Sequence, residues 1–224
     1  MHFVTATRLF TVCCGSTRLA DLSTVIFLVY WKQTMRTTAL LLGAVACAFA
    51  QDPYKVAPDN YKAELENQYV RVSRVTYHKG EHTAEHAHPS IPTVYVYLTD
   101  GGPIRFAHKK PLYTIERKAV SAGQIRFNRN AHVETHETDY LGNEPAEYLR
   151  IELKTKTNRA AEKDARLKVD SDFPWEDEQI RISKALAPTA RPSVLVDVAG
   201  KSFRWLEPNS APPATAQAIL IEIK

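Results

Sequence analysis

The sequence has little cysteine and little glycine, and both shortages exclude kinds of chemistry. All three cysteines, Cys13, Cys14 and Cys47, fall within the first fifty residues, so residues 51–224 can form no disulfide and no thiol-based site. Only eight glycines occur in the whole chain, and none belongs to a glycine-rich loop of the kind that holds phosphates or dinucleotides. The stability of residues 51–224 must therefore come from their core, from a metal or from oligomerisation.

The first fifty residues have the pattern of an export signal. Met35 and a basic residue precede an apolar run that ends in the small-x-small sequence AFA at 48–50. We expect translation to start at Met35, cleavage to follow Ala50, and the mature protein to be periplasmic or secreted, with no stable membrane span. Cys47 leaves open the alternative of a lipoprotein. The earlier apolar run over 25–31 is too short to cross a bilayer of about 30 Å.

Charge is nearly balanced once this leader is set aside. The leader contains four basic residues and one acidic residue, so residues 51–224 carry a net charge near +1. No basic stripe indicates binding to nucleic acid or to anionic lipid. The 174 residues that remain suffice for one domain with a core, or for one domain and a fragment of a second.

Alternating apolar and polar residues indicate β-strands over much of the chain after the leader. The pattern is clearest over 69–77 and 93–98, where β-branched and aromatic residues dominate. Further short segments of this kind follow at hairpin spacing, at 104–107, 113–117, 124–127, 132–137 and 148–153. A set of about eight strands is typical of a jelly roll, so the predicted fold class is all-β. One short helix is expected over 158–169.

The end of the chain repeats parts of the preceding domain. Residues 67–74 (NQYVRVSR) recur as 177–184 (DEQIRISK), and residues 146–154 (AEYLRIELK) recur as 216–224 (AQAILIEIK). The second copy is shorter between these segments and contains no histidine, so any metal chemistry belongs to the first copy. The predicted organisation is a leader over 1–50, a β-barrel over 51–154, a charged linker over 155–175 and a truncated, degenerate repeat over 176–224 packed against the barrel.

Histidines are the residues that point most directly to chemistry. His86 and His88 flank Ala87, six residues after Gly80, and His132 lies in a later predicted strand. Neutral imidazoles that converge from separate strands commonly bind transition metals. The pattern predicts a metal pocket inside the barrel. A solvent-facing position is the alternative for His132.

These residues resemble the first motif of the cupin superfamily, G-x5-H-x-H-x3-4-E-x6-G. Gly80, His86 and His88 fit it, whereas the glutamate position falls on Pro92 or Thr93, neither of which supplies a carboxylate. The resemblance implies a cupin-type jelly-roll barrel over this part of the chain.

The second cupin motif, G-x5-P-x-G-x2-H-x3-N, is matched less fully. Gly123 is present, but His132 follows it by nine residues rather than eleven, and the Pro-x-Gly turn is missing. The similarity covers 52–154 well and the tail weakly, and it extends to small exported bacterial cupins of unassigned activity.

The resemblance implies that His86, His88 and His132 bind a divalent transition metal, which is Fe, Mn, Ni, Cu or Zn. Strand alternation places Glu134 and His136 on the same face as His132, so either is a candidate for an additional ligand. Three histidines alone also hold a metal and leave coordination positions open.

Four other residues are expected to line the barrel. Thr93, Tyr95 and Tyr97 share one face of their predicted strand, where their hydroxyls could orient a polar ligand. Arg126 could pair with an acidic substrate or with a surface carboxylate. Ordinary packing in the core is the alternative for the tyrosines.

Two classes of function remain open. The first is a metal-dependent enzyme, oxygenase-like or isomerase- or hydrolase-like, that acts on a small polar substrate. The second is a non-catalytic small-molecule-binding or sensor protein, which the missing glutamate favours. No residue stands out as a general base or nucleophile. An exposed sheet edge would favour a homodimer.

Overall fold

Strands make up most of the structure, a computed structural model that describes residues 52–109, 111–129, 132–156, 164–168, 172–184, 188–211 and 218–224. The one helix among these residues is α2 (Pro53–Val56), which Asp52 caps by accepting a hydrogen bond from the amide of Tyr54. No helix in the described part of the chain has the length and apolar character to cross a membrane. The predicted leader, with Met35, Cys47 and Ala50, lies outside the described residues.

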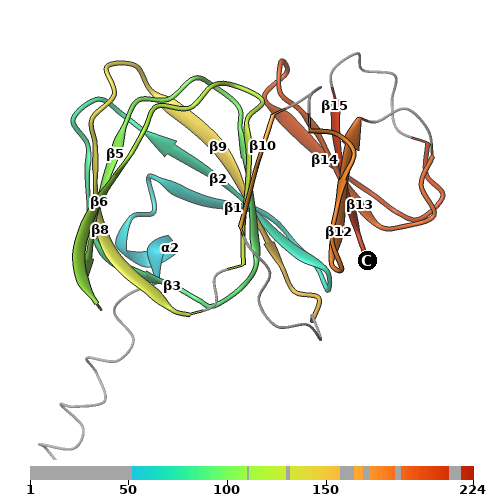
Figure 1. Ribbon diagram of the computed structural model, residues 1–224, viewed down its shortest axis with the longest axis horizontal. Helices are drawn as coiled ribbons and strands as arrows, with labels where there is room; N and C mark the ends of the chain where they lie inside the picture. The colour runs from blue at the N-terminus through green and yellow to red at the C-terminus, as the bar shows by residue number, and fades with distance from the viewer. Residues whose placement is uncertain are drawn as a thin grey trace, which may run out of the picture. The chain divides into compact units, whose positions relative to one another are not determined.

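Eight strands form a jelly roll of two facing sheets (Figure 1). One sheet contains β2-β9-β4-β7 and the other contains β3-β8-β5-β6. The antiparallel pairs are therefore nested, β2 with β9, β3 with β8, β4 with β7 and β5 with β6, which is the pairing of one long hairpin rolled into a barrel. The strands are β2 (Val70–Tyr77), β3 (His82–His88), β4 (Thr93–Tyr97), β5 (Ile104–Lys109), β6 (Leu112–Arg117), β7 (Ile125–Asn128), β8 (Glu134–Tyr140) and β9 (Ala146–Leu153). The predicted all-β jelly roll is confirmed.

Two short strands extend the first sheet at its edges. β1 (Tyr61–Glu66) pairs with β2, and β10 (Ala165–Leu167) pairs with β7. The helix predicted over 158–169 is wrong in its described part, because Ala165–Leu167 is a strand. Hydrogen bonding to the free edge of β7 there outweighs the weak helix propensity of a short charged segment.

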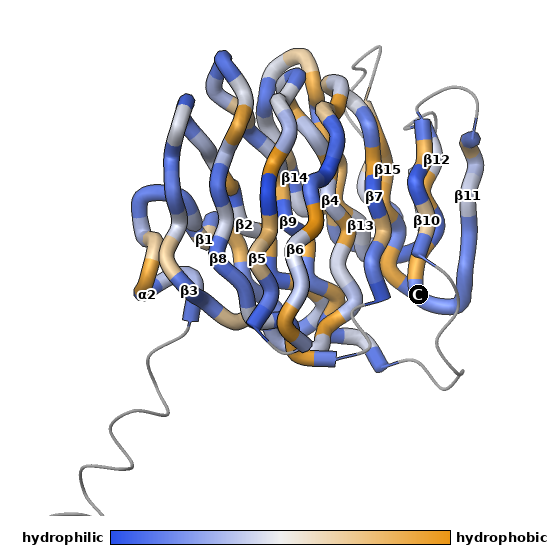
Figure 2. The backbone as a smooth tube through the Cα atoms, turned by 60° about the vertical axis from the view of Figure 1, so that its left-hand side comes forward, coloured by the Kyte–Doolittle hydropathy of each residue, from blue (hydrophilic) through white to orange (hydrophobic). Residues whose placement is uncertain are grey.

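The first sheet is apolar on its outer face and polar on the face inside the barrel. Val94 and Val96 of β4 and Leu149 and Ile151 of β9 point outward into a hydrophobic core and are fully buried. The intervening residues, such as Tyr95, face the barrel interior. The alternation is visible as changes of colour along these strands in Figure 2.

A five-stranded sheet formed by the tail packs against that outer face, as predicted. Its order is β11-β12-β15-β13-β14, and its buried isoleucines and valines belong to the same core as those of the barrel. The strands are β11 (Trp175–Glu176), β12 (Ile180–Lys184), β13 (Ser193–Asp197), β14 (Ser202–Leu206) and β15 (Ala218–Ile223). Packing one sheet on the other buries the apolar faces of both.

The tail sheet repeats several strand pairings of the first sheet, which is the pattern expected of a degenerate repeat. Arg71 opposes Glu152 in the first copy, and Arg181 opposes Glu222 in the second. The amides of Leu153 and Ile223 donate to the carbonyls of Pro92 and Pro192 at 2.8 and 2.9 Å. Within the described residues, the second copy has no counterpart of the sheet that contains β3, β8, β5 and β6. The missing sheet is the one that carries the histidines in the first copy.

Candidate metal centre

The turn and bulge of β3 decide which of its histidines face the barrel interior. Gly80 precedes the strand with a φ of 70°, a conformation that glycine adopts without strain. Pairing with β8 shifts between Thr83 and His86, where a bulge inserts one extra residue. His86 and His88 are consequently buried, whereas His82 points outward and pairs with Asp139 at 2.8 Å.

His86, His88 and His136 come together inside the barrel. The centroids of their rings lie 4.8 to 5.2 Å apart, and their nearest ring nitrogens all lie within 4.8 Å of one another. The antiparallel register of β3 and β8 produces this arrangement, because it places His86 directly opposite His136. His136, which the sequence offered only as an additional ligand, is therefore the third member of the group.

His132 does not join this group. It lies in a bend before the start of β8 at Glu134, and its side chain is exposed to solvent. The alternation argument needed a regular strand through His132, and the strand begins two residues later. The prediction that His132 is a metal ligand is therefore wrong in this structure, and the alternative of a solvent-facing residue holds.

Burial keeps the imidazoles of His86 and His88 neutral, which is the form that binds metals. It lowers the pKa of His86 to about 4, against a smaller opposing effect of the hydrogen bond to the Ala84 carbonyl. Nδ1 of His86 donates that bond at 2.8 Å, so the lone pair of the neutral ring is on Nε2, 3.4 Å from the Tyr61 hydroxyl. Burial, together with the positive charge of Arg150, lowers the pKa of His88 well below its ordinary value.

Glu134 lies beside His108 and His136 rather than beside the β3 histidines. Its Oε1 is 3.5 Å from Nε2 of His108 and 3.7 Å from Nδ1 of His136. Burial opposes ionisation of this carboxyl, but contact with His136 and the charge of Arg117 lower its pKa to about 2. Glu134 is thus an anion next to His136, where a carboxylate can orient a ligating imidazole.

A cavity adjoins two of the three grouped histidines, His88 and His136. Tyr95, Tyr97 and Arg126 line it as expected, together with His88 and His136, whereas Thr93 is buried outside the lining and donates a hydrogen bond to the Ile91 carbonyl at 2.9 Å. The centre of a water-sized molecule can occupy about 60 Å³ of this cavity. One water needs roughly 10–15 Å³ on this measure, so the cavity suits a ligand of a few non-hydrogen atoms.

The sequence analysis missed several residues of the site because they belong to no recognised motif, namely Tyr61, His108, Arg117 and Arg150. Tyr61 belongs to a strand before the first motif, and no spacing links it to the histidines. Arg150 could have been found, because it alternates with Tyr148 on the barrel face of a strand that was predicted.

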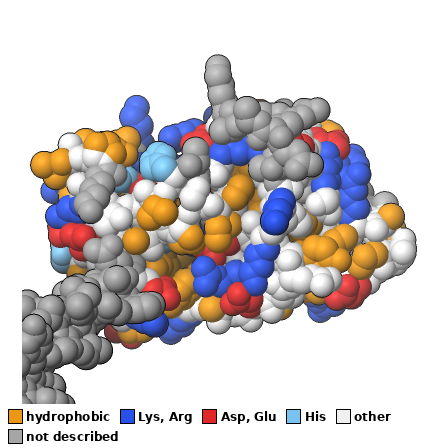
Figure 3. Space-filling model, turned by 90° about the horizontal axis from the view of Figure 1, so that it is seen from below, with side chains coloured by type: hydrophobic (Ala, Val, Ile, Leu, Met, Phe, Trp, Pro, Cys, Tyr) orange, Lys and Arg blue, Asp and Glu red, His pale blue; other side chains and the backbone are white. Residues whose placement is uncertain are grey.

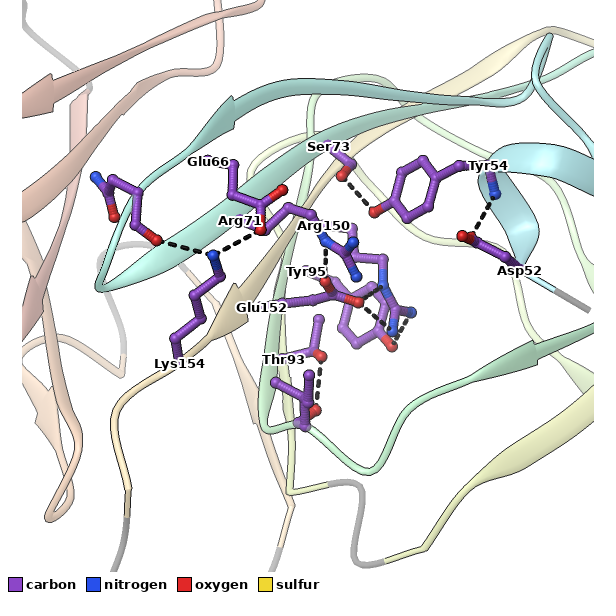
Figure 4. A network of polar contacts seen from close by, with 12 residues as sticks. Asp52, Tyr54, Glu66, Arg71, Ser73, Thr93, Tyr95, Arg150, Glu152 and Lys154 are labelled. Carbon is purple, nitrogen blue, oxygen red and sulfur yellow. Dashed lines mark hydrogen bonds and ion pairs between the residues drawn. The ribbon is translucent and has the colours of Figure 1, made fainter. Parts of the chain in front are cut away.

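A buried ion-pair network supports the floor of the cavity (Figure 4). Arg150 donates from Nη1 to the Tyr95 hydroxyl at 3.0 Å and from Nε to Glu152 at 3.1 Å. Arg71 reaches the other oxygen of the same carboxylate at 2.5 Å. Burial alone would lower the pKa of Arg150, but the neighbouring Tyr95 and Glu152 raise it above its ordinary value, so its charge is permanent.

Comparison with known proteins finds similarity in structure only. No family model matches the sequence, and no curated protein is significantly similar to it. The protein YhaK from Escherichia coli is similar over 73% of this chain and 91% of its own, with 11% identity and a TM-score of 0.48. The bacterial pirin YhhW from Escherichia coli, in complex with nickel(II), is similar over 78% of this chain and 82% of its own, with 12% identity and a TM-score of 0.39. A cupin domain from Bordetella pertussis Tohama I is similar over 42% of this chain and 92% of its own, with 19% identity and a TM-score of 0.36.

The likeness to these structures concerns the fold alone. The nested strand order of the barrel is by itself that of a jelly roll. The similar solved structures include a cupin domain and a cupin superfamily protein. The strand order of the barrel confirms the predicted jelly-roll fold, and the similarity to solved cupin structures goes no further than this fold.

Proposed function

We propose that the protein is a metal-dependent enzyme that acts on a small polar substrate inside the jelly roll. The observation that supports this best is the buried group of His86, His88 and His136. Nδ1 of His88 makes no hydrogen bond within the described residues, although it is buried. Buried polar atoms without partners are costly, and a bound ion relieves that cost. An all-imidazole donor set favours iron, nickel, copper or zinc over calcium and magnesium.

A bound metal would supply a Lewis acid or a site for dioxygen, because three protein ligands leave coordination positions open. The chain itself supplies the substrate's surroundings. Tyr61 lines the cavity, and burial raises its pKa well above the ordinary value, so its hydroxyl stays protonated and can donate a hydrogen bond to a substrate oxygen. Phe106 and Tyr148 line the same cavity and exclude water from its apolar side.

A non-catalytic binding or sensor protein is the second candidate function. It is favoured by Thr93, which occupies the glutamate position of the cupin motif and is held to the Ile91 carbonyl. The structure therefore offers the three histidines no carboxylate from β4. Both functions predict a ligand in the cavity, and they differ in turnover.

Elemental analysis of the purified protein tests the metal centre. We expect near-stoichiometric iron, manganese, nickel, copper or zinc, lost in His86→Ala and His136→Ala because each removes one of three ligands. His132→Ala is the matched control and should retain the metal, since His132 is exposed. Metal that survives His136→Ala, or that is lost in His132→Ala, would show that the site is elsewhere.

Turnover assays on the metal-loaded protein distinguish the two functions. An enzyme should consume oxygen, hydrolyse or isomerise a small substrate, and lose that activity in His136→Ala. A binding protein should show stabilisation by ligand with no product formed.

Export and a homodimer remain part of the proposal. The leader pattern over 1–50 supports export, which N-terminal sequencing of the processed protein tests by a first residue at Gln51. The edge strand β6 supports self-association, because it pairs only with β5 among the described strands and exposes Leu112 by 83%. Sedimentation of wild type against Leu112→Asp tests this, with a dimer expected only for wild type.

A further inference from the structure

The cavity beside the three histidines has an excess of positive charge that the rest of the protein does not share. On the molecular face of Figure 3, basic side chains are interspersed with acidic ones. The cavity lining instead contains five basic residues, Arg117, Lys118, Arg126, Arg150 and Arg166, and one carboxylate, Glu134. This imbalance favours an anion as the occupant.

Only part of this charge is neutralised by the protein. Arg150 shares Glu152 with Arg71, so this network of two cations and one anion keeps a net positive charge. Arg117 approaches Glu134 at 3.9 Å. Arg126 has no carboxylate among its contacts in the described part of the chain.

Arg126 is the residue whose surroundings point most clearly to a missing anion. Its side chain is only 9% exposed, and its Nε donates to Oδ1 of Asn128 at 3.0 Å. Its Nη1 is buried and has no hydrogen-bond partner. The guanidinium lies 5.4 Å from the centroid of the Tyr95 ring, and Arg126 is directly opposite Arg166 in the β7–β10 pair. A buried guanidinium that has an N–H group without a hydrogen-bond partner and a second cation beside it is unfavourable unless an anion is bound.

We propose that Arg126 holds the carboxylate of a small organic anion, and that this anion is the substrate or ligand of the histidine centre. The inference rests on the proposed function for the role of the metal end of the cavity. Arg117 and Arg166 add to the positive potential, and Arg126 supplies the directed hydrogen bond, which is the usual way in which arginine recognises carboxylates. Tyr97, Ile104 and Phe106 line the same cavity and suit the carbon skeleton of such an anion. The limited volume restricts this skeleton to a few carbon atoms.

Binding of malonate to the full chain tests this proposal, with neutral malonamide as the matched ligand and phosphate as an anion without a carbon skeleton. Calorimetric titration of wild type should show binding of malonate, at least tenfold weaker binding of phosphate, and none of malonamide. Arg126→Gln should weaken malonate binding at least tenfold, and Arg166→Gln should weaken it several-fold. Arg105→Gln is the control and should change nothing, because Arg105 pairs with Glu116 and Asp139 outside the cavity lining.

The metal content of each sample separates this inference from the proposed function. Malonate binding that depends on Arg126 in a protein without metal would support the carboxylate site and refute the metal centre. A metal-loaded protein that does not bind malonate, or that binds malonate and malonamide equally, would refute the carboxylate site and leave the metal centre standing. Unchanged affinity in both Arg126→Gln and Arg166→Gln would also overturn it, and the second variant settles the question if the first does not fold.

Discussion

Replacing Glu152 with glutamine should destabilise the protein far more than the same change at Glu222, its counterpart in the second repeat. Glu152 is 2% exposed and holds two arginines, of which Arg150 is 3% exposed. At 3.1 Å and an effective dielectric constant of 20, the attraction between Glu152 and Arg150 is about 5 kcal/mol before desolvation. Breaking a buried pair by removing one partner costs about 3–5 kcal/mol, since the other charge stays buried.

The second repeat provides the matched control. Glu222 faces Arg181 at 3.7 Å, and the Arg181 side chain is 44% exposed. The position equivalent to Arg150 is Leu220, so no buried cation would be left behind. An ion pair with one exposed partner contributes about 0–1 kcal/mol. The glutamine in Glu222→Gln can still accept the hydrogen bond that Thr189 donates.

Urea denaturation, followed by circular dichroism and tryptophan fluorescence, measures the free energy of unfolding of both variants, and thermal denaturation followed by the same signals measures their melting temperatures. For a domain of this size, about 1 kcal/mol corresponds to roughly 2–4 °C in the melting temperature. Glu152→Gln should therefore lower the melting temperature by roughly 6–20 °C, and Glu222→Gln by no more than about 4 °C. Equal losses in the two variants would refute the reasoning, as would a loss below about 1 kcal/mol for Glu152→Gln.

Further predictions concern a turn and the response to pH. Gly80→Ala should cost about 1–2 kcal/mol in urea denaturation, because its φ of 70° disfavours a side chain although a Cβ there meets no atom within 4 Å. Gly102→Ala should cost more, since its Cβ would lie 2.0 Å from the Cα of Gly142; a smaller loss than in Gly80→Ala would contradict this. The free energy of unfolding of the metal-free protein should fall by roughly 3 kcal/mol as the pH is lowered from about 6.5 to about 4. The cause is His86, because burial lowers its pKa to about 4 in the folded protein, so that protons bind the unfolded chain first. A stability that does not change between these two pH values, or a His86→Gln variant with an unchanged pH profile, would show that this imidazole is not responsible.

Strand alternation and the repeat were sufficient to predict the barrel and the tail from the sequence. The strand around Tyr95 is buried on both faces, and its alternation separates the valines that enter the shared core from the tyrosines that face the barrel interior. The tail could be recognised because the segment that contains Arg181 copies the segment that contains Arg71. Its sheet follows from the same local pattern.

The third histidine could not be predicted, because pairing between distant strands selects it. His132 and His136 have the same parity, and only the start of β8 at Glu134 and its register with β3 place His136 opposite His86. The bulge after Thr83 is likewise invisible in the sequence. It reverses the parity of β3, so that His82 points outward although His86 points inward.

The sheet of the second repeat and the first sheet of the barrel differ in how many of their faces are constrained by neighbouring structure. In the first repeat, one face of the sheet forms the shared core and the other encloses the histidines, so substitutions on either face are constrained. In the second repeat, Leu195 and Leu220 belong to a small separate cluster that contacts neither. Substitutions on that face would leave both the shared core and the histidine group unchanged, so we expect the tail sheet to tolerate more variation there than the first sheet tolerates on either face.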